Sequence, residues 1–171
     1  MKRAVSLEAV ANISIIVSAV VFCVVMLRVA RVPADAHDAT RPYLPGERIE
    51  AIKGIEPSTA KPTLLLVVRS TCPFCTQSMP FYRQLLDRAS ALHVRAVALV
   101  FDRQEVGEAY LETNGLSPHQ TIALDGNQLV RVKATPTLIL IDASGKVINS
   151  WVGKLGSQAE SEVIEALRRA S

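Results

Sequence analysis

The hydrophobic positions of this 171-residue chain change their period several times after residue 62, and each change predicts a new element. Residues 64–69 and residues 94–101 are short, nearly continuous apolar runs, the pattern of strands buried on both faces of a sheet. Between them, apolar residues of the segment 73–89 recur at offsets of one, four and eight positions, which predicts a helix.

Capping signals predict two more helices. Asp102, followed three residues later by Glu105, resembles a capping box that opens a helix, and Asn114-Gly115 is typical of a helix end. The last helix is predicted to begin with Ser157 and Glu160 in the same arrangement, ahead of an apolar stripe.

Two further strands are predicted close together, at residues 137–141 and 147–152, with the tight turn "DASG" at 142–145 between them. The chain therefore alternates strand, helix, strand and helix, and ends with a hairpin and a helix. This order predicts an α/β fold, in which a central mixed sheet with parallel and antiparallel parts is flanked by helices.

The most hydrophobic stretch lies near the N-terminus, where nineteen uncharged residues separate Glu8 from Arg28. A helix of this length roughly matches the ~30 Å hydrocarbon core of a bilayer. We therefore expect a transmembrane anchor over residues 9–28, after a short tail at 1–8. A cleaved signal peptide with a small-residue site at 34–36 is the alternative, but the apolar run exceeds the usual ~7–15 residues and favours an uncleaved anchor.

Prolines mark the segment that follows, since five of the nine lie between residues 28 and 62. The segment 29–45 is expected to be an extended, Pro-rich stalk that leads into a domain over residues 46–171. Basic residues flank the apolar run on both sides, so the positive-inside rule does not decide its orientation.

The net charge bears on the partners of the chain, and the three cysteines bear on its chemistry. The formal net charge is +3 and no basic stripe is interleaved with aromatic residues, so no nucleic-acid partner is expected. Of the three cysteines, Cys23 lies in the apolar run and is interpreted as a small hydrophobe of the anchor. Cys72 and Cys75 remain as the only pair in the domain.

The stretch "STCPFC" places this pair where a predicted strand ends and a predicted helix begins. The unpaired N–H groups and the dipole at a helix N-terminus favour an anion, so the pKa of Cys72 should be lowered. Cys75 lies three residues on, on the same helical face and one turn deeper, at a spacing that permits a disulfide. Cys72 is expected to exchange with outside thiols and Cys75 to resolve.

Two other uses of the pair are less favoured. A zinc site normally needs four ligands, and the histidines (His37, His93 and His119) are scattered without zinc spacing, so no metal is expected. No other cofactor is expected either, because thiol–disulfide exchange needs only the cysteines and the loop at Pro136. A purely structural disulfide would close so short a loop that it would constrain the unfolded chain little. Thiol–disulfide chemistry is therefore favoured.

A second feature converges on the cysteines. Pro136 stands immediately before a predicted strand, and a cis Thr135–Pro136 bond would turn this loop sharply against the cysteine pair. The backbone of Thr135 would then be free to pair with an extended substrate peptide. Phe74, between the cysteines, is expected to be an exposed contact for partner proteins.

Together these motifs resemble the thioredoxin superfamily, and in particular its membrane-anchored TlpA/ResA-like branch. The resemblance covers roughly residues 46–171 and rests on "TCPFC", on Pro80 five residues after the second cysteine, and on "ATPTLILIDASGKV". It implies that Cys72 is the nucleophile, Cys75 the resolving cysteine and Pro136 the cis-proline. It also implies that Pro80 kinks the helix and that an extra helix and strand lie within 102–132.

Three positions depart from the patterns of this superfamily. Thr71 stands where a tryptophan usually precedes the first cysteine, Leu66 where thioredoxin has a buried aspartate, and Ser78 where ResA-like proteins have a glutamate. No buried carboxylate is therefore visible in the sequence to move protons to or from Cys75. The direction of electron flow stays open.

The resemblance implies a membrane-anchored thiol–disulfide oxidoreductase whose domain lies on the periplasmic, extracytoplasmic side of the cytoplasmic (inner) membrane. It would reduce client proteins such as apocytochrome c or copper-site thiols, and an integral-membrane electron donor of the CcdA/DsbD kind would re-reduce it. One alternative is a copper chaperone of the Sco kind, with His119 as the candidate third ligand. Another is an oxidising, DsbA-like role.

Overall fold

The structure is a computed structural model that describes residues 16–23, 42–49, 55, 61–124, 131–132 and 134–171. The chain divides into two compact units, Met1–Ala39 and Thr40–Ser171. In the first unit residues 16–23 are helical. No helix within the described residues is both long and apolar enough to cross a membrane, and most of the anchor expected over 9–28 lies outside them.

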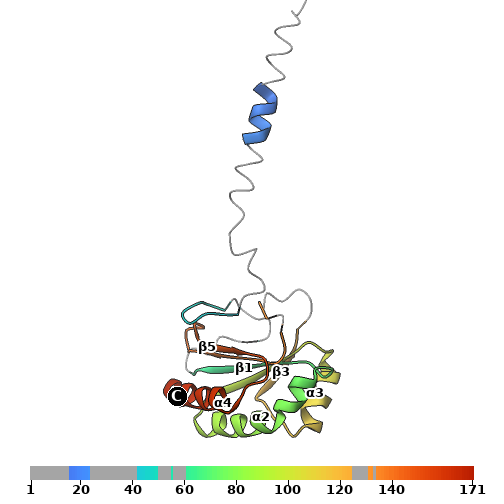
Figure 1. Ribbon diagram of the computed structural model, residues 1–171, viewed down its shortest axis with the longest axis vertical. Helices are drawn as coiled ribbons and strands as arrows, with labels where there is room; N and C mark the ends of the chain where they lie inside the picture. The colour runs from blue at the N-terminus through green and yellow to red at the C-terminus, as the bar shows by residue number, and fades with distance from the viewer. Residues whose placement is uncertain (1–15, 24–41, 50–54, 56–60, 125–130, 133) are drawn as a thin grey trace, which may run out of the picture. The chain divides into compact units, whose positions relative to one another are not determined.

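The second unit contains five strands and three helices among its described residues (Figure 1). In chain order they are β1 Thr63–Val68, α2 Pro73–Ala91, β2 Arg95–Val100, α3 Gln104–Thr113, β3 Gln120–Ala123, β4 Thr137–Ile141, β5 Val147–Val152 and α4 Ser157–Ala170. The strands form one sheet in the order β3-β2-β1-β4-β5. β1, β2 and β3 pair in parallel, whereas β4 pairs antiparallel with both β1 and β5. The predicted α/β fold with a mixed sheet is confirmed.

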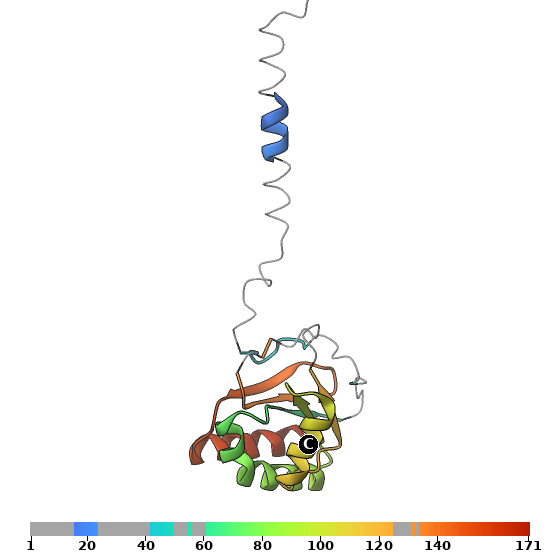
Figure 2. The same ribbon diagram turned by 90° about the vertical axis from the view of Figure 1, so that its right-hand side faces the viewer.

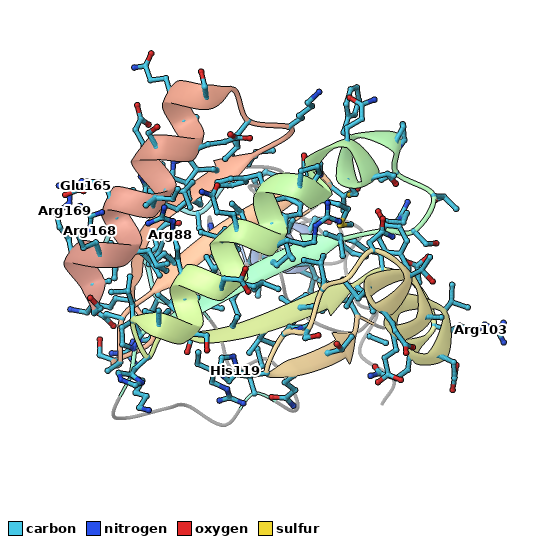
Figure 3. The ribbon with its side chains drawn as sticks, turned by 90° about the horizontal axis from the view of Figure 1, so that it is seen from below. Arg88, Arg103, His119, Glu165, Arg168 and Arg169 are labelled. Carbon is cyan, nitrogen blue, oxygen red and sulfur yellow. The ribbon has the colours of Figure 1, made fainter. Side chains whose placement is uncertain are left out.

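The three helices pack on one face of the sheet. Figure 3 shows α2 between α4 and α3, and Figures 1 and 2 show α2 and α4 running along the same side of the strands. β1 is buried on both faces, as predicted, because Leu64 and Leu66 pack with the helices while Leu65 and Val67 face the other way. That second face packs against Tyr43, a residue expected to lie in the stalk.

The turn between β4 and β5 has the chemistry that its sequence predicted. The carboxylate of Asp142 accepts hydrogen bonds from the backbone N–H groups of Ser144 and Lys146, at 2.8 and 3.0 Å. Gly145 has a φ of +81°, a conformation that glycine adopts without steric cost. β4 and β5 have the bounds that the hydrophobic pattern predicted.

The two predicted capping boxes are wrong, although both helices exist. The N-cap of α4 is Gly156 and that of α3 is Arg103, and neither makes a side-chain capping bond. Ser157 therefore lies inside α4, and the carboxylate of Asp102 bonds elsewhere, to Ser70. For Asp102, a tertiary contact overrides the local sequence signal.

The predicted end of α3 is correct. Gly115 adopts a φ of +67°, and its N–H donates to Glu112 while that of Leu116 donates to Leu111. This is the Schellman arrangement, which satisfies the last carbonyls of a helix. The extra helix and strand implied within 102–132 are α3 and β3, of which β3 is a four-residue edge strand too short to give a periodic signal.

Candidate functional site

The cysteine pair lies where β1 ends and α2 begins. After β1 the chain turns so that the N–H of Cys72 donates to the carbonyl of Arg69, and α2 starts at Pro73, whose missing N–H costs nothing at this position. Cys72 is the N-cap of α2, and its sulfur takes the acceptor place that a serine or aspartate oxygen usually fills. The sequence predicted this junction correctly.

The two sulfurs are close but differ in exposure. The N–H of Cys75 donates to Sγ of Cys72 at 3.3 Å, and both cysteines are free thiols. Cys75 is 0% exposed, whereas Cys72 is half-buried. A thiol or disulfide from outside can therefore reach Cys72, and Cys75 lies one turn behind it.

The environment shifts the two thiol pKa values in opposite directions. Burial raises the pKa of Cys72, but hydrogen bonds from the side chain of Thr135 and from Cys75 outweigh it, so that the pKa of Cys72 lies below its ordinary value. For Cys75 burial dominates and raises the pKa to about 12. Near neutral pH the site therefore holds a thiolate-prone sulfur in front of a protonated one.

The loop before β4 closes over the pair. The Thr135–Pro136 peptide bond is cis, in agreement with the sequence-based expectation. The thiol of Cys72 donates to the carbonyl of Thr135 at 3.3 Å, and Gly153 donates to the carbonyl of Pro136 at 2.7 Å. The structure thus brings Thr135 and Pro136 to Cys72, with the Thr135 carbonyl accepting from the thiol.

Phe74 lies in the first turn of α2, between the cysteines, and is 54% exposed. A large apolar side chain left in solvent beside a reactive sulfur is available to contact a partner protein. Pro80 also lies inside α2 and is exposed, and the helix continues past it to Ala91.

An acidic residue supports the loop that carries Cys72, a role that its sequence pattern did not indicate. Asp102 follows β2, and its two carboxylate oxygens accept from the N–H and the hydroxyl of Ser70, both at 2.7 Å. Ser70 stands two residues before Cys72. Because β1 and β2 are parallel, their carboxyl ends meet at one edge of the sheet, and this topology was the available signal.

Polar groups of α3 and of the buried side of α2 also lie near the cysteines and were not predicted. The hydroxyls of Tyr110 on α3 and Thr76 on α2 are hydrogen-bonded at 3.0 Å, which ties α3 to the turn that carries Cys75. Ser78 and Tyr82 are buried hydroxyl-bearing residues on α2. The sequence could have indicated them, because they stand three and seven residues after Cys75 and so lie on the same side of the predicted helix.

The described residues do not support a copper site at the pair. No three His, Cys, Asp or Glu side chains within the described ranges are grouped as metal ligands. His119, the candidate third ligand, lies just before β3 (Figure 3). It exchanges hydrogen bonds with the backbone of Ala96. Ala96 stands six residues before Asp102, and at ~3.3 Å per residue His119 is roughly 15–20 Å from the cysteine end of the sheet.

Comparison with known proteins agrees with this architecture. Residues 50–168 match the family described as the thioredoxin-like domain. No curated protein sequence matches the chain significantly.

The solved structures that resemble the chain include the following three. One, from Chlorobium tepidum and assigned as the thiol:disulfide interchange protein DsbE, has a TM-score of 0.60 at 24% identity over 74% of this chain and 99% of its own. StoA from Bacillus subtilis has a TM-score of 0.53 at 20% identity over 73% and 98%. A thio-disulfide isomerase from Thermus thermophilus has 0.53 at 22% identity over 72% and 96%. At these identities the likeness establishes the fold.

The family match spans well over half of the chain. The chain belongs to the thioredoxin-like domain family and has the fold of the thiol:disulfide interchange proteins.

Proposed function

We propose that this chain is a thiol–disulfide oxidoreductase that works through Cys72 and Cys75. The observation that carries the proposal is the asymmetry of the pair. An accessible sulfur with a lowered pKa lies at a helix N-terminus, and a fully buried thiol with a raised pKa lies one turn behind it. This asymmetry suits a nucleophile and a resolving group.

In the reducing direction, the Cys72 thiolate attacks one sulfur of a target disulfide. The other target sulfur leaves as a thiolate and takes up a proton, and a mixed disulfide joins Cys72 to the target. Cys75 then loses its proton and attacks the Cys72 sulfur, which releases the second target thiol. The target gains two electrons, and Cys72 and Cys75 end as a disulfide.

The substrate side of the site would be the loop before β4 together with Phe74. An extended client segment would pair with the backbone around Thr135 and Pro136, and this requires the thiol of Cys72 to release the Thr135 carbonyl. Ionisation of Cys72 has that effect, since a thiolate no longer donates. The exposed ring of Phe74 would contact the client beside the exchanging sulfur.

We further propose that the domain reduces extracytoplasmic client proteins from a membrane anchor and is itself re-reduced by an integral-membrane donor. Support for this comes from the apolar run at 9–28, the Pro-rich segment after it and the resemblance of the motifs to the TlpA/ResA-like branch. A disulfide-reducing protein is useful in such a compartment because target thiols oxidise there.

The roles of the cysteines are tested with single variants of the purified chain in a protein-disulfide reduction assay. We expect Cys72→Ser to abolish reduction and Cys75→Ser to accumulate a mixed disulfide with the target, because the second attack cannot occur. Cys23→Ser is the matched control and should keep full activity, since Cys23 lies in the other compact unit. Normal turnover by the Cys75→Ser protein would contradict the assignment of roles.

The direction of electron flow is tested by the reduction potential of the pair, equilibrated against glutathione buffers. A potential near the ~−270 mV of thioredoxin is expected for a reductant. A potential near the ~−120 mV of DsbA would instead identify an oxidant and reject the proposed reducing role, while the exchange chemistry would stand.

A further inference from the structure

Two hydroxyl groups lie on the buried side of α2, where the proposed chemistry has no use for them. Ser78 is 6% exposed and Tyr82 is 1% exposed. They stand three and seven residues after Cys75, so all three side chains lie on one stripe of the helix that faces the sheet. Burying a hydroxyl without a hydrogen-bond partner costs free energy, so the partners of these hydroxyls indicate what role they have.

The hydroxyl of Ser78 donates to the carbonyl oxygen of Phe74 at 2.8 Å. A serine hydroxyl has one hydrogen, and here that hydrogen is committed to the Phe74 carbonyl. Burial raises the pKa of Tyr82, so its hydroxyl stays protonated near neutral pH.

The carbonyl of Phe74 and the N–H of Cys75 belong to the same peptide group. That N–H points at Sγ of Cys72 at 3.3 Å and also at the Cys72 carbonyl at 3.1 Å. Ser78 and the Cys72 sulfur are therefore bonded to opposite ends of one peptide unit. A hydrogen bond accepted by the carbonyl polarises the peptide, so that its N–H becomes a stronger donor.

We propose that Ser78 is a positioning residue for Cys72, whose hydroxyl holds and polarises the Phe74–Cys75 peptide group so that its N–H stabilises the Cys72 thiolate. The inference rests on the proposed function, in which that thiolate is the nucleophile. Burial opposes ionisation of Cys72, and the backbone N–H of Cys75 is among the groups that lower its pKa against this effect. Ser78 thus acts from the core, out of contact with any client.

Other titratable or charged groups on the elements around Cys72 could also affect its ionisation. They are Cys75 and Tyr82 on α2, Tyr110 on α3, Arg69 after β1, Asp102 after β2 and Lys154 after β5. A substitution confined to Ser78 leaves all of these groups in place. A change in Cys72 ionisation in that variant therefore reports the hydroxyl.

The test is the pH dependence of Cys72 alkylation by iodoacetamide in the reduced full chain, with the modified cysteine read by mass spectrometry. We expect Ser78→Ala to raise the pH midpoint of alkylation by about 0.2–0.6 of a pH unit, because the N–H of Cys75 becomes a weaker donor. Ser78→Thr keeps the hydroxyl and should restore the original midpoint.

The matched control is Ser161→Ala. Ser161 is an exposed serine of α4 whose hydroxyl makes the same bond to the carbonyl four residues back, to Ser157 at 2.9 Å. Ser161→Ala should leave the pH midpoint of Cys72 alkylation unchanged. An unchanged midpoint in Ser78→Ala would overturn the proposal, and so would a Ser78→Thr protein that shifts as far as the alanine variant.

If circular dichroism shows that Ser78→Ala does not fold, the comparison of Ser78→Val with Ser78→Thr decides. These two side chains have nearly the same shape and differ in the hydroxyl, so the midpoint should be higher in Ser78→Val, and equal midpoints would reject the proposal. Alkylation requires no turnover. A chain that alkylates as expected but reduces no protein disulfide would therefore contradict the proposed function and leave the role of Ser78 intact.

Discussion

Burial separates the two cysteines more than their chemistry does. Both lie at the N-terminal end of α2, yet the pKa of Cys72 is lowered, because hydrogen bonds outweigh its partial burial, and the pKa of Cys75 is raised to about 12. The hydrogen bonds of Cys72 involve neutral groups, since its sulfur accepts from the backbone N–H of Cys75 and its thiol donates to the carbonyl of Thr135. At the scale of single residues, burial and neutral hydrogen-bonding groups shift the two thiol pKa values.

The raised pKa of Cys75 predicts a pH-dependent stability of the reduced chain. An unfolded thiol ionises near its ordinary value of 9.0, whereas folded Cys75 stays protonated until about pH 12. The unfolded state thus loses the proton first, and the free energy of unfolding should fall by up to about 1.4 kcal/mol per pH unit between these values. Cys72 adds no slope there, because the stability conferred by a lowered pKa is complete by pH 9.

The measurement is denaturant unfolding of the reduced chain at several pH values above 9, compared with Cys75→Ala. The free energy of unfolding should fall less steeply with pH in Cys75→Ala than in the unchanged chain. Tyr82→Phe removes a buried phenol with a raised pKa and should also make the fall less steep, independently of Cys75. Cys23→Ala is the control for loss of a thiol outside the site. Identical slopes in the unchanged chain and Cys75→Ala would contradict the prediction.

α3 lies against β2 more closely than a side chain would allow. A Cβ atom built on Gly107 would come within 2.5 Å of Cγ2 and 2.8 Å of Cβ of Val100. Val100 is stiff because it is β-branched, and it is fully buried, so it cannot move aside. The glycine therefore permits α3 to carry Tyr110 close to Thr76, beside the cysteines.

At the scale of packed elements, we expect Gly107→Ala to destabilise the domain by about 1–3 kcal/mol, because α3 and β2 would be forced apart. Overpacking of this contact outweighs the ~0.5–1 kcal/mol that alanine gains over glycine inside a helix. Chemical denaturation measures the loss, and Val100→Ala in the same chain should recover part of it. Ser161→Ala is the control, because it also places an alanine in a helix but at an exposed position, and it should change stability little. A Gly107→Ala protein as stable as this control would disprove the close packing.

Residues 42–49 belong to the compact unit Thr40–Ser171, although they precede its first strand, β1. Tyr43 is 3% exposed, its ring lies 4.6 Å from the guanidinium of Arg131, and its hydroxyl accepts from the Arg131 N–H at 3.2 Å. Arg131 also pairs with Glu47 at 2.9 Å. These contacts join residues 42–49 to the segment just before the cis-proline loop, on the sheet face opposite the helices.

Tyr43→Ala should therefore destabilise the whole unit by about 3–5 kcal/mol, the usual loss for a buried aromatic side chain. The adjacent Leu44 is 45% exposed, and Leu44→Ala should cost less than about 1 kcal/mol. Urea unfolding of the two variants makes the comparison. Equal midpoints would mean that Tyr43 does not stabilise the unit.

The sequence alone predicted the elements whose signal is local and long enough to read. The buried strands at β1 and β2, the bounds of β4 and β5 and the junction that carries Cys72 all follow from continuous apolar runs, turn residues and one Cys-x-x-Cys spacing. These features depend on residues close together in the chain, so they are visible without the fold.

Only the tertiary structure decided which distant residues serve the site. Asp102 has the local signature of a helix cap, yet it binds Ser70, because parallel strands bring the two loops to one edge. The helix α4 begins one residue earlier than its capping pattern predicted, with Gly156 as the N-cap in place of Ser157. Ser78 stands where a carboxylate was expected, and its link to Cys72 through one peptide group required knowledge of hydrogen-bond partners. A sequence specifies residue types and spacing, whereas contacts across the chain depend on how the whole core packs.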